Sequence, residues 1–232
     1  MPRFSPMLLL AAFAALAAPV GSIATPPTEP TALTREVNLA TAAATAVIGG
    51  LQQKINGGTA TPADIAPEAL SAGFAHQYQL LAGQAQAPAG ADRAAIRATI
   101  ERSMREVVTE FRQDILRGGQ DAFVPAFFRA QLLQRFNTAD RRFRTVATTR
   151  DSELINRDSS LSRLIDDPEI LTFVTRLMEA GHKQPEMRSF AGRTVGYWPM
   201  VIAEGCASCH QRNGLNQQVG GFGGATVVIL NQ

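Results

Sequence analysis

Residues 187–230 read MRSFAGRTVGYWPMVIAEGCASCHQRNGLNQQVGGFGGATVVIL and hold the clearest strand-forming patterns of the chain. Residues 187–190 and 193–202 flank the pair Ala191-Gly192, and this arrangement predicts a β-hairpin. Residues 225–230 (ATVVIL) are an apolar, β-branched run after a cluster of glycines, which is typical of a buried strand. The sequence therefore predicts an antiparallel sheet in the C-terminal half of the chain.

Helical patterns fill most of the chain before this stretch. The clearest covers residues 96–115, where apolar side chains recur at intervals of three and four and Gly118-Gly119 follow. Further helices are predicted over residues 34–55, 61–81, 123–137 and 167–180, with one strand at 142–149. Because helices come first and strands gather late, the predicted fold class is α+β.

Two of these helices begin with capping signals. Thr61, Pro62 and Asp64 supply an N-cap, a first-turn proline and a first-turn acid for the helix over 61–81. Asp167-Pro168-Glu169 do the same for the helix over 167–180. Capping therefore explains the pair Asp166-Asp167 better than an acid/base pair does.

Composition excludes several classes of protein. With 232 residues, 45% hydrophobic and 18% charged, the chain is not fibrous, disordered or a polytopic membrane protein. The net charge is +2, Lys54 and Lys183 are the only lysines, and no basic run occurs, so nucleic acid is not an expected partner.

The N-terminus has the pattern of a secretory signal peptide over residues 1–24. Arg3 precedes an apolar stretch, and Ser22 and Ala24 occupy the −3 and −1 positions of a cleavage site. The alternative is an uncleaved anchor, but the apolar stretch is shorter than the roughly 20 residues that a spanning helix needs. We expect export to a bacterial periplasm, a leader at residues 25–33, and no membrane span after cleavage.

The two cysteines of the chain lie together in Cys206-Ala207-Ser208-Cys209-His210. C-x-x-C-H is the attachment motif of c-type haem, in which each thiol bonds one vinyl group and the histidine is the proximal iron ligand. A redox-active disulfide is disfavoured because the motif follows a hairpin near the C-terminus, and zinc because no second cysteine pair exists. The motif predicts one covalent haem c, held by Cys206 and Cys209, with His210 on the iron.

The residues after the motif separate classes of haem protein. No methionine follows His210, which excludes small electron-transfer cytochromes that take a downstream methionine ligand. The glycines at 220–224 would interrupt the last helix of a four-helix cytochrome. No lysine or helix follows them, so they predict tight turns before the last strand and not a phosphate loop.

Residues 197–210 (YWPMVIAEGCASCH), with the glycines and final strand that follow, resemble the PAS-like c-type haem domain. This family includes a soluble cyanobacterial haem protein and the periplasmic input domains of bacterial sensors. Residues 123–136 and 143–156 are also similar to it, so the resemblance covers about residues 120–230. The resemblance implies a PAS-like haem domain at 120–232, and the helical pattern before it predicts a separate helical N-terminal part at 34–119. The haem would then lie between an antiparallel sheet and flanking helices, with His210 proximal.

The resemblance leaves the sixth iron ligand open. One member of the family uses a cysteine on the helix corresponding to residues 125–136, but this chain has no third cysteine. His76 and Met104 are the candidate distal ligands, and a five-coordinate or water-bound iron is the alternative. His182 follows a helix-ending glycine and is expected to be exposed.

Aromatic and arginine side chains are further candidates for haem contacts. Tyr197 and Trp198 are expected either to pack on the porphyrin edge or to be plain core, and Phe127 and Phe128 to be core. Arginines near the site could pair with the haem propionates, but the sequence does not identify which.

These features predict a periplasmic mono-haem c-type cytochrome acting in electron transfer or redox chemistry with a redox partner protein. The alternative is a haem-based sensor of redox state or of a small diatomic ligand. In sensors of the family a membrane helix and an output domain follow the haem domain, whereas this chain stops at Gln232, so sensing would need a separate partner. A peroxidase-like catalytic role is a third alternative, but no distal histidine–arginine pair can be assigned, so a carrier or a sensor is expected ahead of an enzyme.

Overall fold

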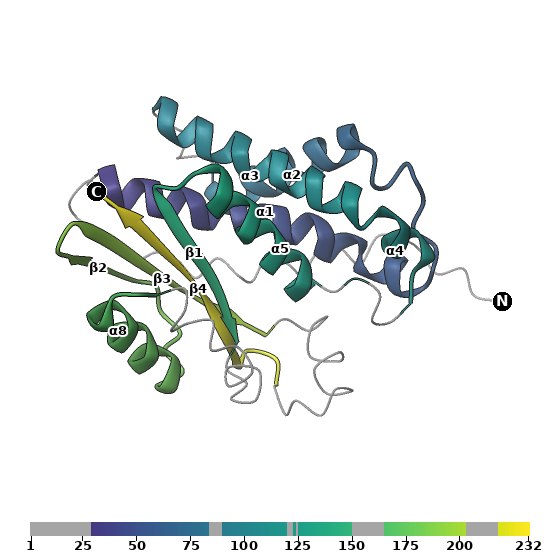
Figure 1. Ribbon diagram of the computed structural model, residues 1–232. Coiled ribbons are helices and arrows are strands. Elements are labelled where there is room, and N and C mark those ends of the chain that lie inside the picture. The colour runs from purple at the N-terminus through teal and green to yellow at the C-terminus, as the bar shows by residue number, and fades with distance from the viewer. Residues whose placement is uncertain (1–28, 84–89, 120–122, 124, 150–164, 203–217) are drawn as a thin grey trace.

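The computed structural model describes residues 29–83, 90–119, 123, 125–149, 165–202 and 218–232. Over these residues six helices accompany a four-stranded antiparallel sheet, which confirms the predicted α+β class (Figure 1). In chain order the elements are α1 (Glu29–Asn56), α2 (Pro67–Ala82), α3 (Ala91–Glu110), α4 (Arg112–Arg117), α5 (Pro125–Ala139), β1 (Phe143–Thr149), α8 (Pro168–Glu179), β2 (Glu186–Phe190), β3 (Arg193–Val201) and β4 (Phe222–Asn231).

The sheet has the strand order β1-β4-β3-β2, and each neighbouring pair is antiparallel. The predicted hairpin is confirmed as β2 and β3, joined at Gly192, whose φ is 67°. The predicted last strand is also confirmed: β4 lies at the centre of the sheet, and its residues 222–230 are all buried. A strand covered on both faces needs a continuous apolar run, which explains the sequence ATVVIL.

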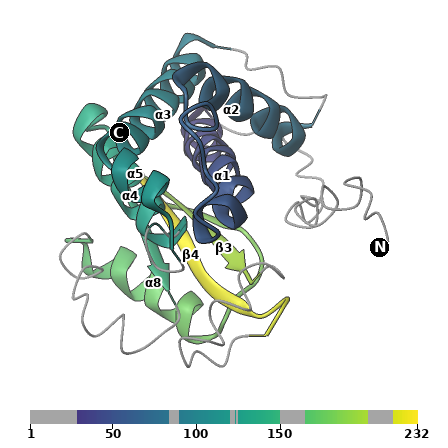
Figure 2. The same ribbon diagram turned by 90° about the vertical axis from the view of Figure 1, so that its right-hand side faces the viewer.

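Helices α1, α2, α3 and α5 lie on one face of the sheet, here called the helix face (Figures 1 and 2). One hydrophobic core extends from Leu33 on α1 to Leu230 on β4. Ala40, Ala43 and Ala44 on α1 are fully buried, and their small side chains allow neighbouring elements to approach closely. The helical N-terminal part and the sheet therefore share one core.

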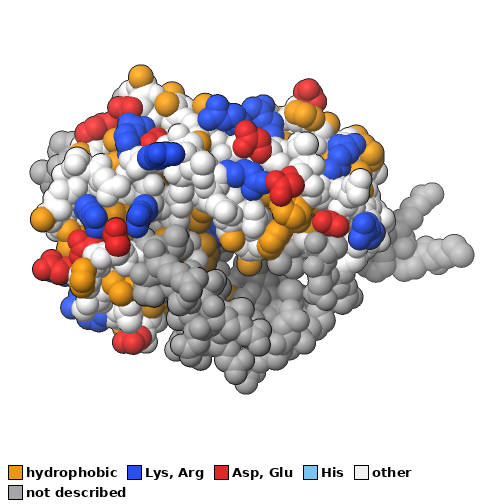
Figure 3. Space-filling view, in the orientation of Figure 1, with side chains coloured by type: hydrophobic (Ala, Val, Ile, Leu, Met, Phe, Trp, Pro, Cys, Tyr) orange, Lys and Arg blue, Asp and Glu red, His pale blue; other side chains and the backbone are white. Residues whose placement is uncertain are grey.

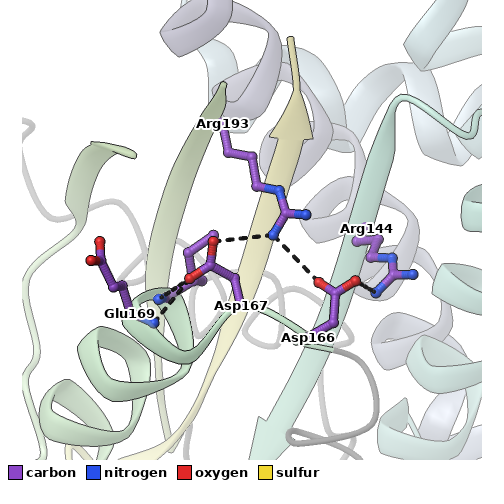
Figure 4. Close-up of polar contacts among 6 residues, drawn as sticks. Arg144, Asp166, Asp167, Glu169 and Arg193 are labelled. Carbon is purple, nitrogen blue, oxygen red and sulfur yellow. Dashed lines mark hydrogen bonds and ion pairs between the residues drawn. The ribbon is translucent and has the colours of Figure 1, made fainter. Parts of the chain in front are cut away.

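Helix α8 covers the opposite face of the sheet and forms a second core with it. The predicted cap is confirmed: Asp167 Oδ1 accepts hydrogen bonds from the backbone N–H groups of Glu169 (2.9 Å) and Ile170 (3.2 Å). Asp166 instead forms ion pairs with Arg144 of β1 and Arg193 of β3, at 3.4 Å each (Figure 4). Both acids therefore serve to attach the start of α8 to the sheet.

Two helix starts differ from the predictions. Helix α1 begins at Glu29, inside the predicted leader, because Pro30 lies in its first turn, where a proline is tolerated. Helix α2 begins at Pro67 and not at Thr61. Thr61 and Asp64 bond to each other in a separate turn, and Ala66 is extended, the conformation that a following proline favours.

The predicted helix over 96–115 is divided in two. Phe111 has φ −94° and ψ 17°, which separates α3 from α4, and Gly118 ends α4 at φ 68°. The helix predicted over 123–137 is α5, and the strand predicted over 142–149 is β1. The arrangement brings α5 next to β1 and lays it against the helix face of the sheet (Figure 1).

Candidate functional site

The haem-attachment motif, with Cys206, Cys209 and His210, lies outside the described residues, as does the predicted signal peptide. The residues on either side of the motif are described, and they hold both ends of that segment together. Ile202 donates a backbone hydrogen bond to Gly221 O, and Gly220 donates one to Ile202 O, each at 2.9 Å. We call Ile202, Gly220 and Gly221 the neck. It lies where the chain leaves β3 and returns to β4.

Two glycines give the neck its tight geometry, as the sequence predicts. Gly220 has a φ of 77°, which favours glycine, and Gly221 donates a 2.8 Å hydrogen bond to Gln218 O. A Cβ atom on Gly221 would lie 2.8 Å from that same carbonyl oxygen. From the loop after α8, Lys183 Nζ donates a 2.9 Å hydrogen bond to Gly220 O. The neck is therefore a fixed part of the sheet end.

Arg129 of α5 reaches the same end of the sheet from the helix face. Its guanidinium donates hydrogen bonds to Met200 Sδ on β3 and to Thr226 Oγ1 on β4. Its Nε is buried and has no hydrogen-bond partner among the described residues. Burial lowers the pKa of the Arg129 guanidinium to about 10, and no charged group of the described chain offsets this effect.

The side chains of β4 on the helix face become smaller toward the neck. Far from the neck it carries the large side chains of Leu230 and Val228, with Phe143 beside them. Near the neck it carries Thr226 and Gly224, which pair with Ala147 and Met200 on the neighbouring strands. The side chains of Ala147, Gly224 and Thr226 are small, and the larger Trp198 and Met200 of β3 lie beside them on the same face.

Tyr197 and Trp198 lie on opposite faces of β3. Tyr197 is fully buried in the core beside α8, and its hydroxyl donates a 3.1 Å hydrogen bond to His182 O. Trp198 packs against the core of the helix face and covers Gly196, where a Cβ atom would lie 2.0 Å from the indole ring. Both side chains have core contacts, and packing of either on a porphyrin stays a prediction.

The two candidate distal ligands are placed differently. His76 is exposed on α2, which packs on α1 and α3. Met104 is fully buried in the core that those helices form. Iron ligation by either side chain stays a prediction. Within the described ranges, no group of three or more His, Cys, Asp or Glu side chains could hold a metal ion.

Two smaller expectations are corrected. His182 is half-buried and not exposed, because its ring lies 6.3 Å from that of Tyr197 and its Nε2 lies 3.2 Å from Glu186 Oε1. Phe128 is core as expected, but Phe127 is 38% exposed. Phe127 packs edge-on against Phe111 at 5.0 Å between ring centroids, so it lies at the rim of the core.

The described residues at the neck fit a haem in two respects. A haem is a flat, largely apolar ring whose two propionate carboxylates are anionic and usually find cationic or hydrogen-bonding partners. The side chains of Ala147, Gly224 and Thr226 near the neck are small, and the buried Nε of Arg129, which has no partner among the described residues, offers a donor for a carboxylate. Sequence reasoning did not identify Arg129, although its place three residues before Leu132 indicates the buried side of α5.

The described surface carries charges of both signs. Arginines and acidic side chains are interspersed on the face that Figure 3 shows. Several of them pair, among them Arg142 with Asp92 at 3.0 Å and with Asp140 at 2.8 Å. No helix in the described part of the chain combines the length and hydropathy needed to cross a bilayer.

No protein-family model, curated protein or solved structure matches this chain. The comparisons therefore identify no family, and the resemblance to the PAS-like c-type haem domain stays a hypothesis that rests on the motif and its flanking strands.

Proposed function

We propose that this chain is a periplasmic mono-haem c-type cytochrome that transfers electrons to and from a redox partner protein. The observation that carries the proposal is the sequence Cys206-Ala207-Ser208-Cys209-His210, which contains both cysteines of the chain. When bound, the haem supplies one-electron redox chemistry at its iron. Cys206 and Cys209 would hold it through thioether bonds, and His210 would be the proximal ligand.

The described residues on either side of the motif segment, Ile202 and Gly220-Gly221, support this proposal. The neck joins both ends of the motif segment to the sheet through the hydrogen bonds of Ile202. The segment that carries the motif in the sequence therefore begins and ends at the same end of the sheet, where β3 ends and β4 begins.

A second candidate function is a haem-based sensor of redox state or of a diatomic ligand, signalling through a separate partner. One observation favours it: His76 is exposed and Met104 is packed in the helical core, so each has a place that needs no iron. An iron without a sixth protein ligand would bind nitric oxide or carbon monoxide. Axial ligation therefore separates the two functions.

Covalent attachment is the first test. The full chain is expressed in a bacterium that carries the c-type maturation system, and the periplasmic protein is analysed by mass spectrometry and by haem staining after denaturation. We expect a chain that starts at Thr25 and carries one haem, and loss of that haem in Cys206→Ala/Cys209→Ala. His76→Ala serves as the control and should keep the covalent haem. The proposal would be contradicted if the parent chain carried no covalent haem. It would also be contradicted if the double variant retained the covalent haem.

Carbon monoxide separates the carrier from the sensor. We expect an electron carrier to give a low-spin absorption spectrum that carbon monoxide leaves unchanged in the reduced state. A high-spin spectrum that shifts on addition of carbon monoxide would instead support the sensor. The spectra of His76→Ala and Met104→Leu then identify a protein ligand, because loss of a sixth ligand converts low-spin iron to high-spin iron.

A further inference from the structure

Arg129 is a buried cation without a carboxylate partner in the described part of the chain. Among the described residues its guanidinium contacts two neutral acceptors, Met200 Sδ and Thr226 Oγ1. Other arginines of the described chain are paired with acids: Arg135, further along α5, pairs with Glu110. Arg193 on β3 pairs with both Asp166 (3.4 Å) and Asp167 (3.3 Å).

A buried guanidinium is costly unless an anion compensates it. Removing an ion from water costs several kcal/mol in real proteins, and buried charges are therefore nearly always paired. Thr226 is fully buried and Met200 is half-buried, so two neutral atoms replace the water that Arg129 loses. The Nε–H group of Arg129 has no partner among the described residues, so it is free to donate a hydrogen bond to an acceptor.

The position of Arg129 indicates which anion its guanidinium binds. Met200 lies two residues before Ile202 of the neck, and Thr226 lies five residues after Gly221. The guanidinium therefore sits at the sheet end from which the haem-attachment segment departs and to which it returns. The small residues Ala147 and Gly224 lie at the same end.

We propose that the Arg129 guanidinium binds a propionate carboxylate of the haem. This inference rests on the proposed function, since it requires a haem attached at Cys206 and Cys209. A guanidinium matches a carboxylate in charge and in the geometry of its donors, and a buried pair of this kind is stronger than one in water. A protein carboxylate is the other source of the same chemistry, and Glu204 is the acid nearest the neck in sequence.

The charge next to a propionate affects two measurable properties of the haem. A nearby cation disfavours ferric iron, which carries one more positive charge than ferrous iron, and so raises the reduction potential. The cation also keeps the propionate ionised, so the potential stays independent of pH around neutrality. Among the described residues no charged group shifts the pKa of Arg129, which is lowered by burial.

The test is a potentiometric titration of the haem-loaded full chain between pH 5 and pH 9. We expect a flat potential in the parent. We expect Arg129→Gln to lower the potential and to make it rise as pH falls, because the unpaired propionate then takes up a proton. Arg129→Lys, which keeps the charge, should stay close to the parent. Arg135→Gln is the matched control, since it removes one arginine from the same helix at an ion pair outside the neck.

Mass spectrometry first establishes that each variant carries one covalent haem. A parent without haem overturns both the proposed function and this inference. Haem-loaded Arg129→Gln that behaves like Arg135→Gln overturns this inference alone. Glu204→Gln distinguishes the source of the carboxylate: if it reproduces the effect of Arg129→Gln, the protein carboxylate is the partner and the propionate is not. If Arg129→Gln fails to fold, Arg129→Lys provides the test. A reduction potential that depends on pH in Arg129→Lys would contradict a role for the positive charge at position 129.

Discussion

The hydroxyl of Tyr78 on α2 donates a 2.7 Å hydrogen bond to Glu36 Oε1 on α1, and both side chains are buried. Arg97 of α3 lies 3.4 Å from the same oxygen and 5.0 Å from the centre of the Tyr78 ring. This trio joins three of the four helices on the helix face. Burial nevertheless raises the pKa of Glu36 above its ordinary 4.5, against the opposing effects of Tyr78 and Arg97.

The raised pKa of Glu36 predicts how stability changes with pH. The folded chain binds this proton more tightly than the unfolded chain, so the contribution is complete below pH 4.5 and is lost as pH rises through the folded pKa. Glu36→Gln keeps an acceptor for Tyr78 and removes the charge. We expect its melting temperature to match the parent at low pH and to exceed it at pH 7.

Thermal unfolding at several pH values measures this difference. Tyr78→Phe is the companion variant, because it leaves the buried carboxylate without its donor and should cost about 1–3 kcal/mol at neutral pH. A gap between parent and Glu36→Gln that stays the same from pH 4 to pH 8 would show that Glu36 does not titrate in the way its burial implies.

Two glycines in the helical layer, Gly118 and Gly50, should have opposite effects on stability when each is replaced by alanine. Gly118 has a φ of 68°, and a Cβ atom there would lie 2.5 Å from Ile55 O and from Gly58 Cα. Gly50 is helical, exposed and open, with no atom within 4 Å of the added Cβ. Gly118→Ala should therefore destabilise by about 1–3 kcal/mol, whereas Gly50→Ala should stabilise by about 0.5–1 kcal/mol. Urea unfolding of the two variants measures both changes, and equal midpoints would contradict the close contact of α4 with the end of α1.

The cap of α8 predicts a loss of stability that is specific to one acid. Asp167→Ala removes the acceptor of two backbone N–H groups and the ion pair with Arg193, so it should cost about 1–2 kcal/mol. Glu169→Ala removes a first-turn acid that accepts no hydrogen bond in the described structure, and we expect a loss below about 1 kcal/mol. Urea unfolding compares them, and a larger loss in Glu169→Ala would argue against the cap.

The sequence predicts the sheet better than it predicts the helix ends. The hairpin of β2 and β3 follows from a local turn at Gly192, and β4 follows from an apolar run that only a doubly covered strand would carry. The start of α2 is predicted wrongly because Thr61 and Asp64 form the hydrogen bonds of a capping box in an isolated turn. Pro67 then imposes a later start, and two competing local signals of this kind cannot be ranked from sequence alone.

Arg129 is an example of a residue that could not be identified from the sequence. The residue stands among the apolar positions of α5, where Phe128 and Leu132 predict a buried face. Its partners Met200 and Thr226 are separated from it by 71 and 97 residues. Only the pairing of β3 with β4 brings these two side chains to one place. The chemistry of the motif is local and can be predicted, whereas the surroundings of the motif depend on tertiary packing.

The buried charge of Arg129 predicts effects of opposite sign in the apoprotein and the haem-loaded protein. Arg129→Met/Thr226→Val replaces the guanidinium and its hydroxyl partner by apolar groups of similar size, so no hydrogen-bonding group is left unpaired between them. In a Cys206→Ala/Cys209→Ala background the cost of burying a charge disappears, and we expect stability to be unchanged or higher, by on the order of 1 kcal/mol. In the haem-loaded chain the same pair of substitutions removes the partner of a propionate, and we expect a lower melting temperature. Calorimetry of the four proteins measures both differences, and a loss of equal size with and without haem would mean that Arg129 stabilises the sheet end by itself and serves no anion.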